Sequence, residues 1–354
     1  MMKKALVTGV TGQDGANMAE FLLGMEDIKV FGMVRHSSVP NHKNIESFAN
    51  HPRFELVTGD LTDEVSINKL VKEILPDYFI NFGANSFVGC SWDMPLHVFD
   101  VNALGVIRCL EAIRNYKPEC RFYSAGSSEQ FGNVDYCPQD LKHPMKPRSP
   151  YGASKCSAHH IVKVYRESYN IYAIHSILFN HEGTRRGEEF VTRKISKGVA
   201  RILFAIKDGK KFDPIELGNL DSKRDWSDSE DFVKGIWLML NQEKPKDYLL
   251  ASGENHSIQE FVEKAFQIAG IKGFWQGQGV DQKYYLGNLI HEEYPDINGC
   301  LVKVNPKFYR PAEVNVLLGD PSEITEELGW KPRVSFDKLV EKMVRCDIEI
   351  ASEN

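Results

Sequence analysis

The 354-residue sequence lacks the features that mark membrane, secreted and nucleic-acid-binding proteins. No apolar run approaches the ~20 residues that a membrane-spanning helix needs. The chain passes almost directly into a short strand-like run, so we expect no secretory signal. The seven cysteines are odd in number and contain no C-x-x-C pair, which disfavours disulfides and a cysteine-bound metal. A formal net charge of −6 gives no support to nucleic-acid binding. We therefore expect a cytoplasmic protein with reduced thiols, no metal, and no nucleic-acid or membrane partner.

Short apolar runs alternate with amphipathic stretches in the first half of the chain. The runs lie at residues 5–7, 30–34, 54–57, 78–82, 121–124 and 173–178. In one intervening stretch the apolar residues recur at helical spacing on a single face, at Ile67, Leu70, Val71, Ile74 and Leu75. Strands that alternate with helices predict an α/β fold with a doubly wound, Rossmann-like parallel sheet. The pattern loosens after about residue 180. We predict a sheet domain over residues 1–180 and a smaller substrate domain over residues 181–354, with segments that cross back.

A glycine-rich turn follows the first apolar run, in the sequence T-G-V-T-G-Q-D-G. Glycines at this spacing permit a tight turn, let the backbone approach a pyrophosphate closely, and place the phosphates at a helix N-terminus. The pattern is G-x-x-G-x-x-G, which in isolation could be an ordinary turn. Its position between the first strand and the first helix favours a dinucleotide site. The predicted contacts are Gly9, Thr11, Gly12, Gln13, Asp14 and Gly15.

The end of the second strand indicates which dinucleotide binds. NAD enzymes usually place an acidic residue there for the ribose hydroxyl, whereas this strand is followed by Arg35, His36 and Ser37. A guanidinium beside hydroxyl groups suits a 2′-phosphate, so we predict NADP, with Arg35 and Ser37 as contacts. Asp60 and Leu61 are expected at the adenine edge, and Ser86 in the turn that covers the phosphates.

A tyrosine and a lysine four residues apart open a later helical stretch. Tyr151 and Lys155 share one helix face because they stand at i and i+4. We expect the ammonium of Lys155 to lower the pKa of the Tyr151 phenol, which makes the phenol a usable base. This pairing can take a proton from an alcohol while a hydride leaves for nicotinamide.

These motifs, with a serine at the end of the fifth strand, resemble those of the extended short-chain dehydrogenase/reductase family. Within it the sequence is similar over nearly its whole length to the GDP-mannose 4,6-dehydratase family. The matching segments are residues 8–15, 148–155, 178–182, 185–187, 190–194, 217–220, 223–226, 309–314 and 329–333. The resemblance implies an NADP-dependent lyase that oxidises C4 of a GDP-linked mannose or close relative, eliminates water across C5–C6 and returns the hydride to C6.

The catalytic hydroxyl and carboxylate of this family fall on Ser127 and Glu129, within G-S-S-E-Q-F-G. Once C4 is a ketone the C5 proton is acidic. A carboxylate can remove it, and the protonated carboxyl can then help the C6 hydroxyl leave. The alternative is that Ser128 and Glu129 are only a helix N-cap and a first-turn acid. The family pattern at this place is S-T-S-E-L-Y-G. The chain departs from it at Gly126, Ser127, Gln130 and Phe131, and it carries Phe87 in place of a histidine, so the exact sugar is in doubt.

The resemblance also assigns the nucleotide-sugar contacts. Lys194, Arg224 and Arg310 are expected to clamp the diphosphate, and Glu313 and Asn180 to accept or donate hydrogen bonds. The remaining expected contacts are Ser86, Val191, Leu217 and Gly218 for the substrate, and His181 and Arg186 for the cofactor. Residues 185–187 resemble a loop that reaches a neighbouring subunit's cofactor, which predicts a homo-oligomer, either a dimer or a tetramer.

Three alternatives remain open. The absence of a side chain at Gly126 could enlarge the pocket for GDP-manno-heptose. A GDP-sugar 4-epimerase or reductase would share the tyrosine and lysine, but it would need no eliminating carboxylate, so Glu129 disfavours it. A non-catalytic NADP-binding protein of the same fold is disfavoured by the presence of Ser127, Glu129, Tyr151 and Lys155.

Overall fold

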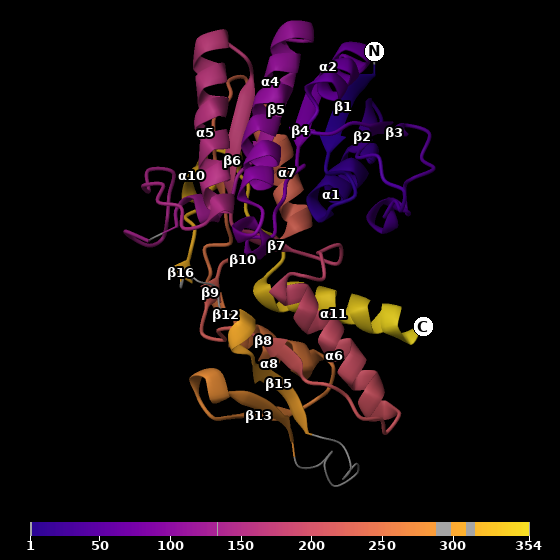
Figure 1. The fold of residues 1–354 in the computed structure, drawn as a ribbon, viewed down its shortest axis with the longest axis vertical. Coiled ribbons are helices and arrows are strands. Elements are labelled where there is room, and N and C mark those ends of the chain that lie inside the picture. The colour runs from indigo at the N-terminus through magenta and orange to yellow at the C-terminus, as the bar shows by residue number, and fades with distance from the viewer. Residues whose placement is uncertain (1, 133, 288–298, 309–315, 354) are drawn as a thin grey trace.

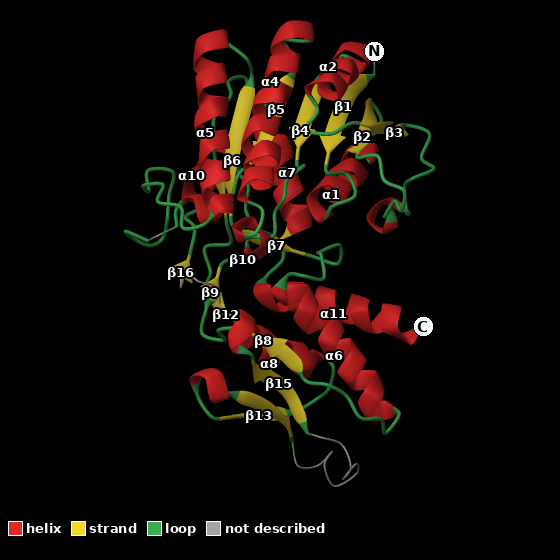
Figure 2. Ribbon diagram, viewed as in Figure 1, coloured by secondary structure: helices red, strands yellow, loops and turns green. Residues whose placement is uncertain are grey.

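The chain forms a large lobe built on a parallel sheet and a smaller lobe beyond the carboxyl ends of its strands (Figures 1 and 2). The structure is a computed structural model that describes residues 2–132, 134–287, 299–308 and 316–353. Arg310 and Glu313, two of the expected substrate contacts, lie outside the described residues.

The large lobe contains a seven-stranded sheet in the order β11-β6-β5-β4-β1-β2-β3, with all pairs parallel. The strand order reverses beside β1, so the carboxyl ends of β1 and β4 flank the crevice where open α/β sheets bind ligands. The strands are β1 (Lys3–Thr8), β2 (Ile28–Val34), β3 (Phe54–Thr58), β4 (Tyr78–Asn81), β5 (Arg121–Ala125), β6 (Ala173–Leu178) and β11 (Leu249–Leu250). The predicted doubly wound parallel sheet is confirmed.

Helices cover both faces of this sheet. On one face α2 (Glu64–Ile74), α4 (Gly105–Tyr116) and α5 (Pro150–Tyr169) pack their apolar sides on the strands. On the other face lie α1 (Gln13–Leu23), α7 (Ser229–Leu240) and α10 (Ser322–Leu328). The strands other than the edge strand β3 are mostly buried, which is why their apolar runs are nearly continuous; β3 is largely exposed. The later half of the chain therefore supplies β11, α7 and α10 to the large lobe.

The smaller lobe has its own apolar core. Its four-stranded sheet, in the order β13-β14-β15-β8, consists of β8 (Ile215–Leu217), β13 (Gly273–Gln276), β14 (Lys283–Leu286) and β15 (Cys300–Val304). The helices α6 (Val191–Lys207), α8 (Ile258–Ile268) and α11 (Phe336–Ser352) belong to this lobe. Short strands lie between the two lobes in Figure 1: β7 (Asn180–Glu182) pairs with β10 (Trp226–Asp228), and β9 (Lys223–Arg224) lies between β12 (His256–Ser257) and β16 (Val316–Leu317).

Short helical turns complete the described part. They are η1 (Lys43–Ile45), η2 (Gly89–Trp92), α3 (Pro95–Phe99), η3 (Asp100–Leu104), η4 (Ser128–Gln130), η5 (Gly279–Asp281) and η6 (Pro306–Phe308).

The predicted helical face around residues 67–75 is correct except at its last member. Ile67, Leu70 and Ile74 are buried against the sheet, but α2 ends at Ile74. Leu75 caps the helix in the left-handed region (φ 51°) and is 44% exposed. The helix ends here because Pro76 follows, since a residue before proline is disfavoured in the right-handed helical region.

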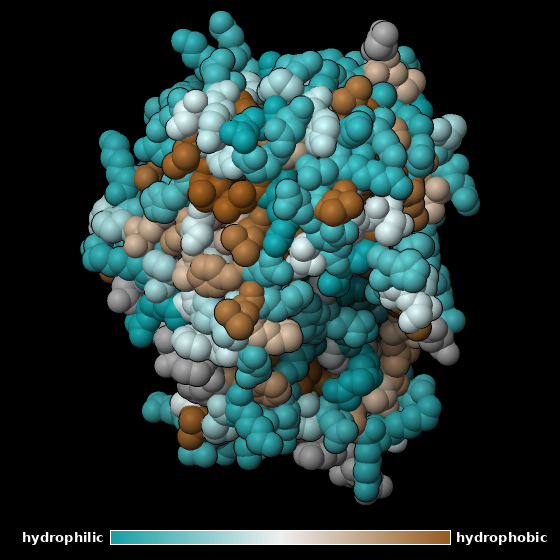
Figure 3. All heavy atoms as spheres, turned by 45° about the horizontal axis from the view of Figure 1, so that its top comes forward, coloured by the Kyte–Doolittle hydropathy of each residue, from teal (hydrophilic) through white to brown (hydrophobic). Residues whose placement is uncertain are grey.

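The surface in Figure 3 is largely hydrophilic, with hydrophobic residues gathered left of centre. Over the described residues, no helix combines the length and apolarity that crossing a membrane would require.

Candidate active site

The glycine-rich turn is packed so closely, on itself and on the segment after β4, that two of its glycines have no space for a side chain. Gly9 has φ +64°, and a Cβ there would lie 2.9 Å from the Gly83 nitrogen. A Cβ on Gly15 would lie 2.6 Å from the carbonyl carbon of Gly9. Gly12 differs, because its Cβ would meet only the Gly9 oxygen, at 3.1 Å. Gly12 is the N-cap of α1. The first N–H groups of this helix have no partner within the helix, and its dipole favours a negative charge at this end.

A cavity of about 910 Å³ lies between the lobes, at the carboxyl ends of the strands. Most of the predicted site residues line it. From the large lobe these are Gly9, Thr11, Gly12, Gln13, Asp14, Gly15, Arg35, Asp60, Leu61, Ser86, Ser127, Glu129, Tyr151 and Lys155. The later segments add Asn180, His181, Arg186 and Arg224. The volume of the cavity is at the upper end of the range of about 300–1,000 Å³ that is usual for ligand-binding pockets.

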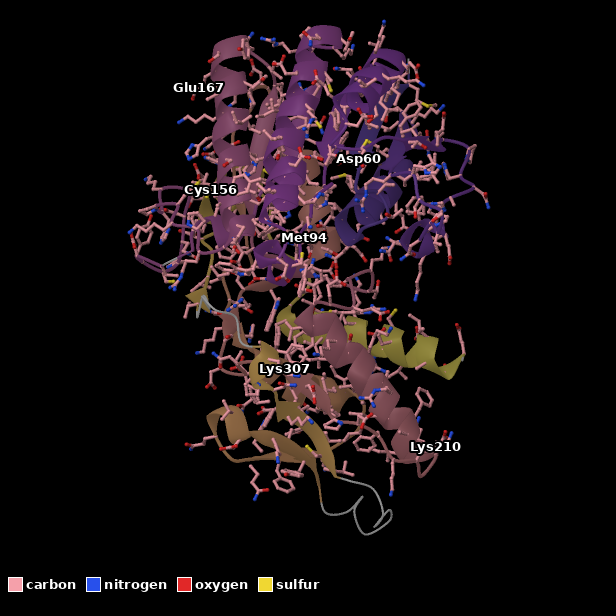
Figure 4. The ribbon with its side chains drawn as sticks, viewed as in Figure 1. Asp60, Met94, Cys156, Glu167, Lys210 and Lys307 are labelled. Carbon is pink, nitrogen blue, oxygen red and sulfur yellow. The ribbon has the colours of Figure 1, made fainter. Side chains whose placement is uncertain are left out.

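Five predicted residues do not line this cavity. The Ser37 hydroxyl instead bonds the backbone of Val39, 3.1 Å from its oxygen. The others, which are Val191, Lys194, Leu217 and Gly218, lie in the small lobe. The Lys194 ammonium sits 3.7 Å from the centre of the Phe308 ring, and a Cβ on Gly218 would lie 2.7 Å from the Phe308 oxygen. Lys194 and Gly218 therefore meet at η6, immediately before the segment that contains Arg310. Figure 4 labels Lys307 of η6 in the small lobe and Asp60 in the large lobe.

Many of the lining residues were not predicted from the sequence, and three of them lie between β2 and β3. Asn41, Lys43 and Asn44 lie on the loop after β2 and line the cavity with Arg35. The Asn44 amide donates to the Thr11 oxygen at 2.9 Å, which ties this loop to the glycine turn. Lys43 could have been predicted from the sequence, because it is a second basic residue in the segment that begins with Arg35 at the end of β2.

Tyr151 and Lys155 lie in the first turns of α5. Ser149 caps this helix, because its hydroxyl accepts a hydrogen bond from the Gly152 nitrogen at 3.0 Å. The side chains of Tyr151 and Lys155 are both buried, and the Lys155 ammonium donates to the Ala125 oxygen at 2.7 Å. It lies 5.9 Å from the centre of the Tyr151 ring. The helix thus presents both groups to the cavity, as the i, i+4 spacing predicts.

The expected lowering of the Tyr151 pKa is wrong. Burial raises the pKa of Tyr151 to about 12; the hydrogen bond with Ser127 opposes this rise, and the Glu129 carboxylate adds to it. Burial also lowers the pKa of Lys155 to about 8, although the Asp14 carboxylate acts in the opposite direction. Desolvation outweighs the charge of Lys155 because its ammonium is directed at a backbone oxygen rather than at the phenol.

The turn after β5 brings the serine and the carboxylate into the same cavity. Ser127, and not Ser128, is the N-cap of η4, and its hydroxyl accepts a hydrogen bond from the Glu129 nitrogen at 3.2 Å. Gln130 completes a capping box, because its side-chain oxygen accepts from the Ser127 nitrogen at 2.9 Å. The capping role and a chemical role are therefore compatible: the cap orients a turn whose Ser127 and Glu129 both line the cavity.

A charged network joins the glycine turn to the segment after β6. The His181 ring lies 2.9 Å from the Asp14 carboxylate, and Gln13 donates to the His181 oxygen at 3.0 Å. Burial lowers the pKa of His181, but the Asp14 carboxylate outweighs this and leaves the pKa raised. Arg186 pairs with Glu182 at 2.9 Å and lines the cavity of its own chain.

Arg185 also contacts its own chain. Its guanidinium lies 2.7 Å from the Asn17 oxygen and 2.8 Å from the Glu20 carboxylate, both on α1. The loop expected to reach a neighbouring subunit thus has both of its arginines bonded within the chain.

The expectation of a larger pocket at Gly126 is wrong in its premise. A Cβ on Gly126 would overlap the Ser176 oxygen and lie 2.5 Å from the His175 Nε2 atom. Gly126 lines the cavity with its backbone, but a side chain there would point at β6 and Gln130, so its absence does not enlarge the cavity. The relaxed specificity inferred from this position has no support in the packing.

The comparisons with known proteins identify the family of the chain. The family model described as GDP-mannose 4,6 dehydratase matches residues 6–343. A GDP-mannose 4,6 dehydratase of Drosophila melanogaster is 44% identical, covering 99% of this chain and 88% of the relative. A GDP-mannose 4,6-dehydratase of Yersinia enterocolitica is 42% identical, covering 100% of this chain and 96% of the relative. A solved dTDP-glucose 4,6-dehydratase of Streptomyces venezuelae with NAD bound has the same fold, with a TM-score of 0.78, 20% identity and 99% and 98% of the two chains covered. The chain belongs to the GDP-mannose 4,6-dehydratase family.

Proposed function

We propose that this chain is a nicotinamide-dependent 4,6-dehydratase of a GDP-linked sugar, with GDP-mannose as the first candidate. The observation that carries the proposal is that Ser127, Glu129, Tyr151 and Lys155 line one cavity with the glycine turn. Family membership supports the GDP-sugar, because the relatives are named for GDP-mannose.

The residues of the glycine turn fit a dinucleotide. Gly12, the N-cap of α1, lines the cavity, and the buried Gln13 Oε1 atom has no hydrogen-bond partner among the described residues. Backbone N–H groups at this helix end would hold the pyrophosphate. A nicotinamide bound in the same cavity would supply the acceptor and donor of a hydride.

The chain's own groups then handle the protons. The Tyr151 oxygen takes the proton of the C4 hydroxyl, and the Ser127 hydroxyl, already hydrogen-bonded to Tyr151, holds that oxygen in place. Glu129 removes the C5 proton once C4 is a ketone, and returns it to the C6 hydroxyl as water leaves. Because burial raises the Tyr151 pKa to about 12, its action as a base near neutral pH requires positive charge close to the phenol. The Arg186 charge already opposes the rise of the Tyr151 pKa, and the Lys155 ammonium and an oxidised nicotinamide ring bound in the cavity would add positive charge.

We further propose NADP over NAD. Arg35 follows β2 at the cavity rim, and Lys43 lines the same cavity. Two cations and no acidic residue at the end of β2 suit a 2′-phosphate. Arg35 also acts on Asp60, whose pKa is lowered: burial raises it, but hydrogen bonds from Thr62 and the charge of Arg35 prevail.

The division into a dinucleotide domain (residues 1–180) and a mainly nucleotide-sugar domain (residues 181–354) also stays a proposal, as does a homo-oligomer. The oligomer rests on the resemblance of residues 185–187, and the bonds of Arg185 and Arg186 within the chain give it no added support.

Mass analysis of the product tests the function. The protein is incubated with catalytic NADP and separately with GDP-mannose, GDP-manno-heptose, GDP-glucose and UDP-glucose. We expect a GDP-sugar product lighter by one water, with no net NADPH. The proposal would be contradicted if no GDP-sugar lost water, or if only UDP-glucose did. An epimer of unchanged mass would favour the 4-epimerase.

A further inference from the structure

A polar pair is buried directly behind the catalytic turn. The Gln130 and His175 side chains are both fully buried. The Gln130 Oε1 atom accepts from the Ser127 nitrogen at 2.9 Å and lies 3.1 Å from His175 Nε2. The other ring nitrogen of His175 lies 3.2 Å from the Ser124 hydroxyl on β5.

The hydrogen-bond chemistry fixes the orientation of this pair. A backbone N–H can only donate, so the atom that faces Ser127 must be the amide oxygen of Gln130. His175 Nε2 must then carry the proton that it donates to that oxygen, and Nδ1 accepts from Ser124. Burial and the nearby His159 and Lys155 charges lower the pKa of His175 well below its usual value, so the ring stays neutral and the pairing persists across the working pH range.

Gly126 provides the space for this pair. A Cβ at Gly126 would lie 2.5 Å from His175 Nε2 and 2.7 Å from Gln130 Oε1. The family pattern has serine at position 126 and leucine at position 130, whereas this chain has glycine and glutamine. The two departures are thus physically linked, since the smaller residue makes room for the larger polar one.

The same turn rests on the helix that carries the tyrosine. A Cβ on Gly152 would lie 2.6 Å from the Glu129 oxygen, so the turn abuts α5 one residue after Tyr151. A shift of the Ser127 backbone would therefore move the Ser127 and Glu129 side chains relative to Tyr151.

We propose that Gln130 is a positioning residue: its side-chain oxygen, oriented by His175, holds the Ser127 backbone and thereby sets Ser127 and Glu129 against Tyr151. The inference rests on the proposed dehydratase function. A misplacement of about 1 Å can cost ~10²-fold in rate, so loss of this bond should lower kcat far more than it changes binding.

The test compares three variants with the parent on the GDP-sugar that the parent converts best. Gln130→Leu keeps the approximate volume and removes the acceptor, so we expect kcat to fall by about 10–100-fold. KM and the Kd for NADPH should stay within about two-fold of the parent. Gln130→Glu keeps an oxygen acceptor for the Ser127 nitrogen and should recover most of the lost kcat. Met145→Leu is the matched control, because the Met145 sulfur accepts a hydrogen bond from Gln130 Nε2 at 3.8 Å, whereas the Ser127 nitrogen is held by the other end of the same amide, its oxygen.

Parent-like kcat in Gln130→Leu, no recovery in Gln130→Glu, or an equal fall in Met145→Leu would each overturn the inference. If Gln130→Leu does not fold, Gln130→Asn replaces it, since it withdraws the oxygen by one methylene, and the same fall is expected. If the parent converts no GDP-sugar, the proposed function fails separately. Amide hydrogen exchange of residues 126–131 then decides the role of Gln130: faster exchange in Gln130→Leu than in Met145→Leu supports it, and equal exchange overturns it.

Discussion

Two alanine substitutions in the glycine turn should separate the stability of the fold from the binding of the cofactor. In Gly15→Ala the new methyl would lie 2.6 Å from the Gly9 carbonyl carbon and 2.8 Å from the Val10 Cα atom. Neither neighbour is a flexible side chain, so we expect the upper end of the overpacking cost, about 3 kcal/mol. At about 2.1 cal/mol/K of unfolding entropy per residue, this cost lowers the Tm of a 354-residue chain by about 4 °C.

Gly12→Ala is the matched variant. Its methyl would meet only the Gly9 oxygen at 3.1 Å, and its backbone (φ −79°, ψ 174°) suits alanine. The Tm without cofactor should therefore remain near that of the parent. The methyl projects where the pyrophosphate would approach, and loss of one charged hydrogen bond, worth about 1.5–3 kcal/mol, should weaken NADP binding by about 10–100-fold.

Thermal melts with and without NADP measure both effects. At about 100 times its Kd, NADP should stabilise the parent by about 2.7 kcal/mol, a rise of about 4 °C. The same concentration should raise the Tm of Gly12→Ala by about 2 °C or less. The reasoning is refuted if Gly12→Ala loses as much Tm as Gly15→Ala without cofactor, or if its NADP-dependent rise equals that of the parent.

Four further outcomes follow from the site. Arg35→Ala should narrow the preference for NADP over NAD, measured by titration; equal affinities in the parent would remove the assignment. Tyr151→Phe should bind GDP-sugar normally yet lose about 10²–10⁴-fold in kcat, and near-normal turnover would exclude it as the base. Glu129→Gln should accumulate bound NADPH without a 6-deoxy product or deuterium exchange at C5, and release of a product lighter by one water at the parent rate would assign the elimination elsewhere. The Asp14 pKa is lowered, because His181 and Arg186 outweigh burial, and the His181 pKa is raised. The parent should therefore have a higher Tm than Asp14→Asn, and the difference should be largest between pH 3.8 and pH 6.5, the ordinary pKa values of the two groups. The difference should shrink as the pH rises through the raised His181 pKa or falls through the lowered Asp14 pKa. A constant difference from about pH 5 to pH 9 would contradict this prediction.

The sequence alone determined the features that depend on neighbours along the chain. The glycine spacing, the alternation of strands with helices and the i, i+4 pairing of Tyr151 with Lys155 are set by backbone geometry within a few residues. Each of these lies in the structure where the pattern predicts. Long matched segments also carried the family resemblance, which the comparisons confirm.

Only the tertiary structure decided the direction and the surroundings of individual side chains. The sequence placed Gly126 beside the sugar, but β6 and Gln130 fill the space that its side chain would take. The Lys155 ammonium bonds the end of β5 instead of the phenol, so burial controls the pKa of Tyr151. Arg185 bonds α1, more than 160 positions earlier in the chain. Such contacts join segments that are distant in sequence, and desolvation depends on everything packed around a group, so neither can be obtained from the local order of residues.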